Sequence, residues 1–285
     1  MDGELSGDEV CDIVQQVKDD FGAYFMTVLG GEPTIWPHFE EMLEKHSDVY
    51  FHVYTHGQTI TEEKAARYAE LGNVTFAISI EGNEESTDWR RGKGAYARIL
   101  RSMDYLRKAG VMFGYSVTHT PKSHDTILSD EFTSTMAEKG AAFAWVFQFI
   151  PLGRDAGMEL VPTPEQRVER FRRVEELRQK YPIAIFDFWN DGEVTFGCMA
   201  YGKRYMHITN KGWAEPCVFV HFAKHNVREM KLKDIVLSEE FKFARSKMPF
   251  TDDLRAPCSF IDNTEFLPEF VHLFGFQATH KGAEG

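Results

Sequence analysis

Short apolar runs alternate with amphipathic stretches along the first two-thirds of the chain. The runs are apolar at nearly every position, which is typical of strands that are covered on both faces of a parallel sheet. Strands are predicted over 24–30, 49–54, 74–80, 111–118 and 143–150. Their spacing of about 25–35 residues leaves room for one helix between neighbours, so the pattern predicts βα units and an α/β fold.

The amphipathic stretches between these runs carry helix start and stop signals. Ser6 and Thr61 are expected to cap the helices that follow them, and Gly110 and Gly140 are expected to end two others. Helices are predicted over 6–20, 37–46, 61–71, 94–109 and 129–139.

The pattern changes after about residue 156. A charged helix is predicted to run to Lys180, followed by a strand over 183–188 and a hairpin between 205–209 and 213–219. Three of the four cysteines lie in this part of the chain. The sequence is therefore expected to divide into a first domain over 1–156 and a second over 157–285.

Composition and charge narrow the possible partners. The 285 residues are 43% hydrophobic and 27% charged, which is ordinary for a globular protein, and the net charge is -12. That charge argues against nucleic acid or an anionic membrane as the main partner. No apolar run approaches the roughly 20 residues that span a bilayer. The acidic N-terminus is unlike a signal peptide, so the expected location is the cytoplasm.

The end of the first predicted strand carries the first candidate site, Gly30, Gly31, Glu32 and Pro33. Two glycines let the backbone pass close to a ligand without a Cβ in the way, and Pro33 stiffens the exit. The Glu32 carboxylate can accept hydrogen bonds from an ammonium group. A tight turn with a solvated acid is an alternative explanation for these four residues.

Later strand ends repeat this theme. The second ends in Thr55-His56-Gly57 and the third in Ser79-Ile80-Glu81-Gly82, with Arg91 in the segment that follows. Gln148 and Arg154 lie at the end of the last strand of the series. Because parallel α/β sheets carry their ligand sites at the carboxyl ends of strands, these residues are candidates for one binding site.

In this order and spacing, the motifs resemble those of the radical S-adenosylmethionine (radical SAM) superfamily over roughly residues 4–280. Gly30–Pro33 is similar to the GGEP motif, which in that family binds the amino group of the cofactor's methionine part. Residues 55–57 have His where the family has Asn, and residues 79–82 have Glu where it has Asp. The resemblance implies a partial (β/α)6 barrel that lacks its first strand, plus a small C-terminal α+β extension with a β-hairpin.

The resemblance also implies roles for individual residues toward S-adenosylmethionine. Gly30, Gly31 and Glu32 would hold the methionine amino group. Arg91 would offer a bidentate donor to the carboxylate, and an ion pair is the equally weighted alternative. Gln148 and Arg154 are weaker candidates, and Gln148 could instead bridge strands. The implied cofactor-binding residues are Gly30, Gly31, Glu32, Pro33, Thr55, Ser79, Glu81, Arg91 and Gln148.

The later cysteines extend the resemblance. Cys198, Cys217 and Cys258 are similar to ligands of the SPASM/twitch extension, which carries an auxiliary [4Fe–4S] cluster. Three thiolates would leave a fourth ligand to water, substrate or a side chain such as His207 or His221. A Cys₃His zinc site and three unrelated cysteines are the alternatives. Cys11 is expected to be a packed thiol.

One feature of the family is missing from the sequence. Radical SAM enzymes bind their catalytic [4Fe–4S] cluster with a Cys-x3-Cys-x2-Cys loop, and the sequence contains no such spacing. The favoured explanation is an N-terminally truncated chain that is inactive alone, and the other is a natural relative that has lost the cluster.

In intact form, the resemblance implies reductive cleavage of S-adenosylmethionine to a 5′-deoxyadenosyl radical, which abstracts hydrogen from an unknown small-molecule or peptide substrate. Electrons would come from a donor such as ferredoxin or flavodoxin. The alternatives are a cluster-less relative that binds S-adenosylmethionine or a partner, and a βα-barrel protein with a structural zinc site.

Overall fold

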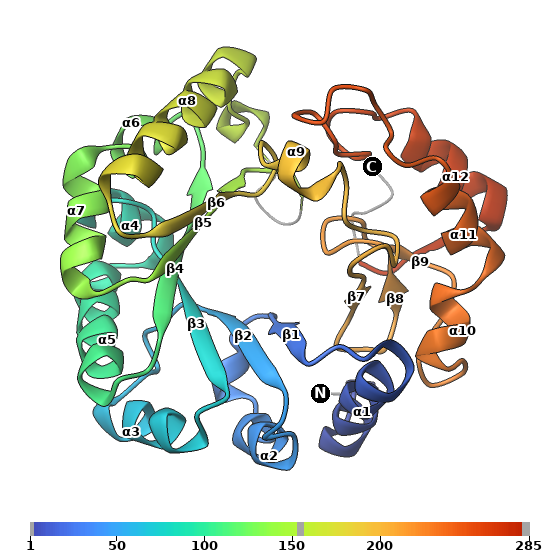
Figure 1. Ribbon diagram of the computed structural model, residues 1–285, viewed down its shortest axis with the longest axis horizontal. Helices are drawn as coiled ribbons and strands as arrows, with labels where there is room; N and C mark the ends of the chain where they lie inside the picture. Colours follow the sequence, from blue (N-terminus) through green and yellow to red (C-terminus); the bar gives the residue numbers. More distant parts are fainter. Residues whose placement is uncertain (1–2, 153–156, 281–285) are drawn as a thin grey trace. The chain divides into compact units, whose positions relative to one another are not determined.

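The computed structural model describes residues 3–152 and 157–280. The chain folds as two compact units (Figure 1). The sheet unit comprises residues 24–149 and 157–188. The cysteine unit comprises 1–23, 150–156 and 189–285, and it contains all four cysteines.

The sheet unit is built on six parallel strands whose spatial order is their order in the chain. The strands are β1 (Phe25–Val28), β2 (Tyr50–Thr55), β3 (Val74–Ser79), β4 (Phe113–His119), β5 (Phe143–Gln148) and β6 (Ala184–Asp187). The sheet curls into a half-barrel with helices along its outer side (Figure 1). The prediction of a partial α/β barrel is confirmed, and β6 joins the sheet beside the five strands of the predicted series.

The helices of the sheet unit connect successive strands. They are η1 (Pro33–Ile35), α2 (Phe39–Lys45), α3 (Glu62–Leu71), α4 (Glu84–Arg91), α5 (Ala95–Ala109), α6 (His124–Ile127), α7 (Asp130–Lys139), η2 (Met158–Leu160) and α8 (Pro164–Lys180). The expected caps are confirmed: the Thr61 hydroxyl accepts the Lys64 N–H, and Gly110 and Gly140 are left-handed. Helix α4 is not among the predicted helices, because its sequence is almost wholly polar and gives no apolar period.

Alternation along the strands gives the sheet two different faces. On the convex face, Phe76 packs against Tyr68 of α3 and Tyr115 against Phe132 of α7. On the concave face, Gly114 of β4 leaves room for a neighbouring ring. A Cβ at Gly114 would lie 2.2 Å from the Phe143 carbonyl oxygen and 2.4 Å from its ring, so only glycine fits there.

The cysteine unit joins the first helix to the C-terminal third of the chain. Its elements are α1 (Gly7–Phe21), α9 (Gly192–Thr195), β7 (His207–Ile208), β8 (Ala214–Glu215), β9 (Phe222–Ala223), α10 (Leu232–Val236), α11 (Glu239–Ser246), α12 (Phe266–Phe274) and β10 (Gln277–Ala278). The predicted hairpin is confirmed by the antiparallel pairing of β7 with β8. Tyr201, Phe241 and Phe270 are fully buried at the centre of the unit's core.

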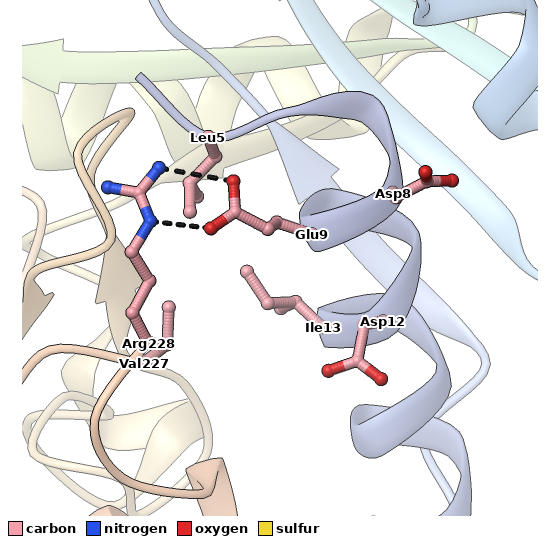
Figure 2. A pocket seen from close by; sticks show the side chains of 7 residues that line it. All are labelled: Leu5, Asp8, Glu9, Asp12, Ile13, Val227 and Arg228. Carbon is pink, nitrogen blue, oxygen red and sulfur yellow. Dashed lines mark hydrogen bonds and ion pairs between the residues drawn. The ribbon is translucent and has the colours of Figure 1, made fainter. Parts of the chain in front are cut away.

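Arg228 fastens the N-terminal segment within this unit (Figure 2). Its guanidinium donates to the Gly3 carbonyl at 3.1 Å and the Glu4 carbonyl at 2.9 Å. It also pairs with the carboxylate of Glu9, which completes a capping box with Ser6 at the start of α1. A surface groove between α1 and this arginine is lined by Leu5, Asp8, Glu9, Asp12, Ile13, Val227 and Arg228 (Figure 2).

Packing groups the chain differently from a cut at 156/157. Helix α1 belongs to the cysteine unit, whereas α8 and β6 belong to the sheet unit. Among the described helices, none combines the length and apolar character required to cross a membrane.

Candidate functional site

The Glu32 carboxylate is the hub of the strand-end site in the sheet unit. Its side chain is 4% exposed. Oε1 accepts hydrogen bonds from the Thr34 N–H at 3.1 Å, the Thr34 hydroxyl at 2.6 Å and the Thr55 hydroxyl at 2.7 Å. Oε2 accepts the His56 N–H at 2.8 Å. Glu32 therefore ties the end of β1 to the end of β2 and fixes the path of the glycine loop before it.

His56 stands where the resembling motif has Asn, and its ring does what an asparagine side chain would do. Nδ1 accepts the Gln58 N–H at 3.0 Å, which is the contact that an Asx turn makes through its side-chain oxygen. Nδ1 also lies 3.3 Å from Glu32 Oε2, so the ring packs directly against the buried carboxylate.

The two glycines of the loop border open space. An added Cβ at Gly30 or Gly31 would meet no heavy atom within 4 Å, and both residues are exposed. Pro33 is buried and begins η1. The loop thus exposes its backbone next to a buried carboxylate, which fits a small ligand that carries an ammonium group.

Glu81 and Arg91, both expected to contact the cofactor, form an ion pair with each other. Glu81 is 3% exposed, and Arg91 donates to its Oε1 from Nε at 2.9 Å and Nη2 at 2.5 Å. Arg90 donates to Oε2 at 2.9 Å. The ion-pair alternative for Arg91 is thus the one observed, and it fastens α4 to the end of β3. Sequence reasoning missed Arg90 because nothing distinguished it from a surface arginine.

Ser79 and Gln148 lie on opposite faces of the sheet. The Ser79 hydroxyl is 3.2 Å from that of Ser116, on the concave face. Gln148 pairs in register with His119, which faces the helices, and its Oε1 is buried with no hydrogen-bond partner in the described part of the chain. The structure therefore does not bring Gln148 to the same face as Ser79. Arg154 lies outside the described residues.

Rings cover the concave face of the sheet. We call the following residues the aromatic wall: His52, Tyr54, Phe143, Trp145, Phe147, Phe186 and Phe188. Trp145 stacks on Phe186 with centroids 4.6 Å apart, and Phe186 is 39% exposed. His52 Nε2 and Trp145 Nε1 are buried without a hydrogen-bond partner among described residues. Burial lowers the pKa of His52 to about 4, so its ring is neutral.

A buried polar chain runs along the convex face. Arg170 pairs with Asp187 through Nη2 at 3.0 Å, and both side chains are almost completely buried. Arg170 Nη1 also donates to His119 Nδ1 at 2.9 Å, so His119 carries its proton on Nε2. That proton is shared with His124 Nδ1 at 2.8 Å, and His124 Nε2 lies 3.2 Å from Glu169. Asp187 stands between two phenylalanines in the sequence, but its side chain lies on the opposite face of the sheet from Phe186 and Phe188.

The three candidate ligand cysteines lie together in the cysteine unit as free thiols. Each sulfur accepts a hydrogen bond from the amide two residues further on. The pairs are Cys198 with Ala200, Cys217 with Phe219, and Cys258 with Phe260. Burial raises the pKa of Cys198 and of Cys217 to about 12, and the charge of Cys258 adds to both shifts. Cys11 is buried on α1, as expected of a packed thiol.

Two strained residues flank Cys198. Phe196 has φ 56° and Tyr201 has φ 58°, and they are the non-glycine residues with positive φ in the described chain. Such conformations cost about 1–3 kcal/mol each and persist where the surroundings impose them. The local strain therefore marks the Cys198 loop as a constrained position.

The thiols do not form a site for a single ion. Among residues 3–152 and 157–280, no three His, Cys, Asp or Glu side chains lie closely enough to hold one metal ion. His207 and His221, the suggested fourth ligands, both approach Glu215, at 2.6 and 3.5 Å. A zinc tetrahedron needs closer donors than a cubane cluster, whose ligands extend from separate corners.

Comparison with known proteins identifies the family. The sequence profile of the radical SAM superfamily matches residues 2–125, a range that contains Gly30–Pro33 and the next two strand ends. Residues 2–125 therefore carry a radical SAM superfamily domain. This radical SAM protein is 26% identical to the AdoMet-dependent heme synthase of Nitratidesulfovibrio vulgaris, over 90% of its own length and 77% of the relative. It is 33% identical to the mycofactocin maturase MftC of Mycolicibacterium smegmatis, over 58% of its own length and 42% of the relative.

Solved structures share the fold. Streptococcus suis SuiB bound to S-adenosylmethionine superposes with a TM-score of 0.70 at 18% identity, over 89% of this radical SAM chain and 65% of that one. Native anSMEcpe with bound AdoMet superposes with a TM-score of 0.66 at 18% identity, over 83% of this chain and 73% of that one. The chain thus spans less than half of the MftC relatives and about three-quarters of the heme synthase.

Proposed function

We propose that this radical SAM protein binds S-adenosylmethionine at the carboxyl ends of β1 to β3. Glu32 Oε2 would accept the methionine ammonium beside the exposed backbone of Gly30 and Gly31. The Thr55 hydroxyl holds the Glu32 carboxylate in place. Ser79, on the concave face, would contact the ribose or the methionine carboxylate of the cofactor. The observation that supports this most is the buried Glu32 hub next to a loop where a Cβ would enter open space.

The chemistry that the bound cofactor supplies in this family is reductive cleavage to a 5′-deoxyadenosyl radical, followed by hydrogen abstraction from a substrate. The chain's own residues bind and orient the cofactor. The sheet unit contains no cysteine, so it provides no thiolate for the cluster that such cleavage requires. We therefore propose that the sheet unit binds the cofactor, and that the radical reaction requires a catalytic cluster whose thiolates this unit does not supply.

A graded substitution tests the cofactor site. Gly31 has an ordinary φ and open space at its Cβ position, so Gly31→Ala and Gly31→Val are expected to fold like the parent chain. Equilibrium dialysis with radiolabelled S-adenosylmethionine is expected to show weaker binding with each step, by at least about tenfold for valine. Equal binding by all three proteins would exclude the glycine loop as the site.

We further infer that Cys198, Cys217 and Cys258 ligate an auxiliary [4Fe–4S] cluster. Support comes from the repeated contact between each sulfur and the amide two residues on, which stabilises a thiolate in all three loops.

Metal analysis tests the auxiliary site. After anaerobic reconstitution, the parent chain is expected to hold about four irons with matching sulfide, and the triple variant Cys198→Ala/Cys217→Ala/Cys258→Ala is expected to hold none. Zinc without sulfide would instead support a structural zinc site, and no metal in either protein would leave a cluster-less binding protein.

The substrate class is proposed from the relatives and the aromatic wall. SuiB has been solved with its precursor peptide SuiA, and SkfB of Bacillus subtilis is a sporulation killing factor maturation protein at 22% identity. We propose a peptide or another small molecule whose apolar part packs on the aromatic wall, with ferredoxin or flavodoxin as electron donor.

A further inference from the structure

Two aromatic side chains direct polar hydrogens at the proposed ligand sulfurs. The Tyr205 hydroxyl lies 2.9 Å from Cys217 Sγ. The Trp189 indole N–H hydrogen-bonds Cys258, and the Trp189 side chain is buried at 2% exposure. The two contacts come from different segments of the cysteine unit and reach different sulfurs.

These contacts suit an anionic sulfur better than a thiol. A neutral thiol is a weak acceptor, whereas hydroxyl and indole groups are full donors that lose free energy when they are buried against a poor partner. A thiolate accepts charge-assisted hydrogen bonds, which are roughly twice as strong. Together with the amide from two residues on, Cys217 and Cys258 each receive a backbone donor and an aromatic donor.

Tyr201 provides a built-in comparison. Its ring lies among the three cysteines, whose charges all act on it, as they do on Tyr205. Its hydroxyl, however, is 2.8 Å from Ser259 Oγ and not on a sulfur. The unit therefore holds two tyrosines in the same surroundings, and they differ in whether the hydroxyl reaches a ligand.

We propose that Tyr205 and Trp189 are positioning residues that raise the reduction potential of the cluster by hydrogen-bonding its Cys217 and Cys258 thiolates. This inference rests on the auxiliary cluster proposed above. Reduction adds negative charge that spreads onto the ligand sulfurs, so a donor to sulfur stabilises the reduced state more than the oxidised state. Cys198 accepts the Ala200 amide, so the two aromatic donors act on the other two of the three ligands.

An EPR-monitored redox titration of the anaerobically reconstituted chain tests the proposal. Tyr205→Phe removes the hydroxyl and keeps the ring. At a fixed solution potential it is expected to lower the ratio of reduced to oxidised cluster about tenfold, which corresponds to 59 mV for one electron. Trp189→Phe is expected to shift the ratio in the same direction through Cys258, and Tyr201→Phe is expected to leave it unchanged.

The outcomes separate the two proposals. Full iron content with an unshifted potential in both Tyr205→Phe and Trp189→Phe overturns the tuning role and leaves the cluster assignment intact. An equal shift in Tyr201→Phe also overturns it, because the effect would then not require contact with sulfur. Absence of iron from the parent chain overturns the cluster assignment and the tuning role together. If Tyr205→Phe does not hold iron, the Trp189→Phe titration tests the tuning role: a lowered potential supports it, and an unchanged potential overturns it.

Discussion

At the scale of single residues, carboxylates and imidazoles that the sequence offered as ligands are held mainly by the protein itself. Glu32 accepts four hydrogen bonds from the chain, and Glu81 is enclosed by two arginines. Such networks place a group with little freedom, which lowers the entropy that a bound ligand must overcome. The residue types were predictable, whereas their partners depend on which loops meet in the fold.

Replacing Glu32 with glutamine tests this placement. One carboxylate oxygen becomes an NH₂ group, which must then face a donor from Thr55, Thr34 or His56. An unsatisfied buried donor costs about 1–3 kcal/mol, so S-adenosylmethionine affinity and stability are both expected to fall. Isothermal titration and urea unfolding measure the two effects. Glu70→Gln, at an exposed position of α3, serves as the control, and equal effects in both variants would contradict the prediction.

His119 gives stability a dependence on pH. Burial, then the charge of Arg170 and of His124, lowers its pKa to about 2, whereas the unfolded chain has an ordinary histidine near pH 6.5. The unfolded state therefore binds a proton that the folded state does not, and stability falls as pH drops below about 6.5. His119→Gln keeps an acceptor for Arg170 and a donor for His124 without titrating.

Urea unfolding between about pH 6 and about pH 4.5 measures this difference. The parent chain is expected to lose up to about 1.4 kcal/mol per pH unit more than His119→Gln, which is the slope for one proton. His52, whose pKa is also lowered by burial, contributes equally to both proteins and cancels in the comparison. Parallel slopes for the two proteins would show that His119 is not the group responsible.

At the scale of elements, segments with a regular apolar period predicted the strands and most helices. Helices in segments without such a period were not predicted. Strand β2 and helix α5 carry strong periods, and both were predicted within about two residues. Helix α4 begins at an Asn83 cap, whereas short helices of the cysteine unit such as α10 have no side-chain cap and depend on tertiary packing. Neither a cap nor tertiary packing leaves much trace in apolar spacing. The charged sequence of helix α8 is typical of a solvated face, yet Arg170 in its middle is fully buried.

Arg170 joins α8 to β4 and β6, so its loss is expected to destabilise the sheet unit. Arg170→Met leaves Asp187 buried without this cation, which costs about 3–5 kcal/mol when a buried pair is broken on one side. The double variant Arg170→Met/Asp187→Leu is expected to recover most of that loss, because it removes the unpaired charge. Chemical denaturation measures both.

Arg172→Met provides the matched control, because Arg172 is an exposed arginine on the same helix. It is expected to change stability by less than about 0.5 kcal/mol. A loss of that small size in Arg170→Met would mean that the buried pair adds nothing to the attachment of α8.

At the scale of the whole molecule, the chain keeps its thiol chemistry and its parallel sheet in separate compact units. All four cysteines belong to the cysteine unit, and the strand-end motifs belong to the sheet unit. The half-barrel could be predicted because parallel strands leave local signals. The grouping of α1 with the C-terminal third could not, because it depends on contacts between residues more than 200 positions apart.

Arg228 is one of the residues that hold this long-range grouping at the surface. The Arg228 guanidinium lowers the pKa of the exposed Glu9 carboxyl to about 2. The stabilisation from this pairing is present above the ordinary pKa near 4.5 and is lost as pH falls toward 2. Arg228→Ala is expected to return the Glu9 pKa toward its ordinary value and to speed amide exchange over residues 4–9.

NMR titration of Glu9 and hydrogen exchange by mass spectrometry measure these effects. Arg255→Ala is the control, because Arg255 is exposed in the same unit and pairs with Asp253. Unchanged exchange over residues 4–9 in Arg228→Ala would show that the backbone contacts of this arginine do not hold the segment.

The position of α1 also has a consequence for synthesis on the ribosome. Its residues Glu9 and Gln16 hydrogen-bond Arg228 and Leu232, which follow them by 219 and 216 residues. At about 5–20 residues per second, they emerge roughly 10–40 s later, after every strand of the sheet unit has been translated. A lone 15-residue helix is only marginally stable in water. Helix α1 is therefore translated before the strands of the sheet unit but is expected to dock after them.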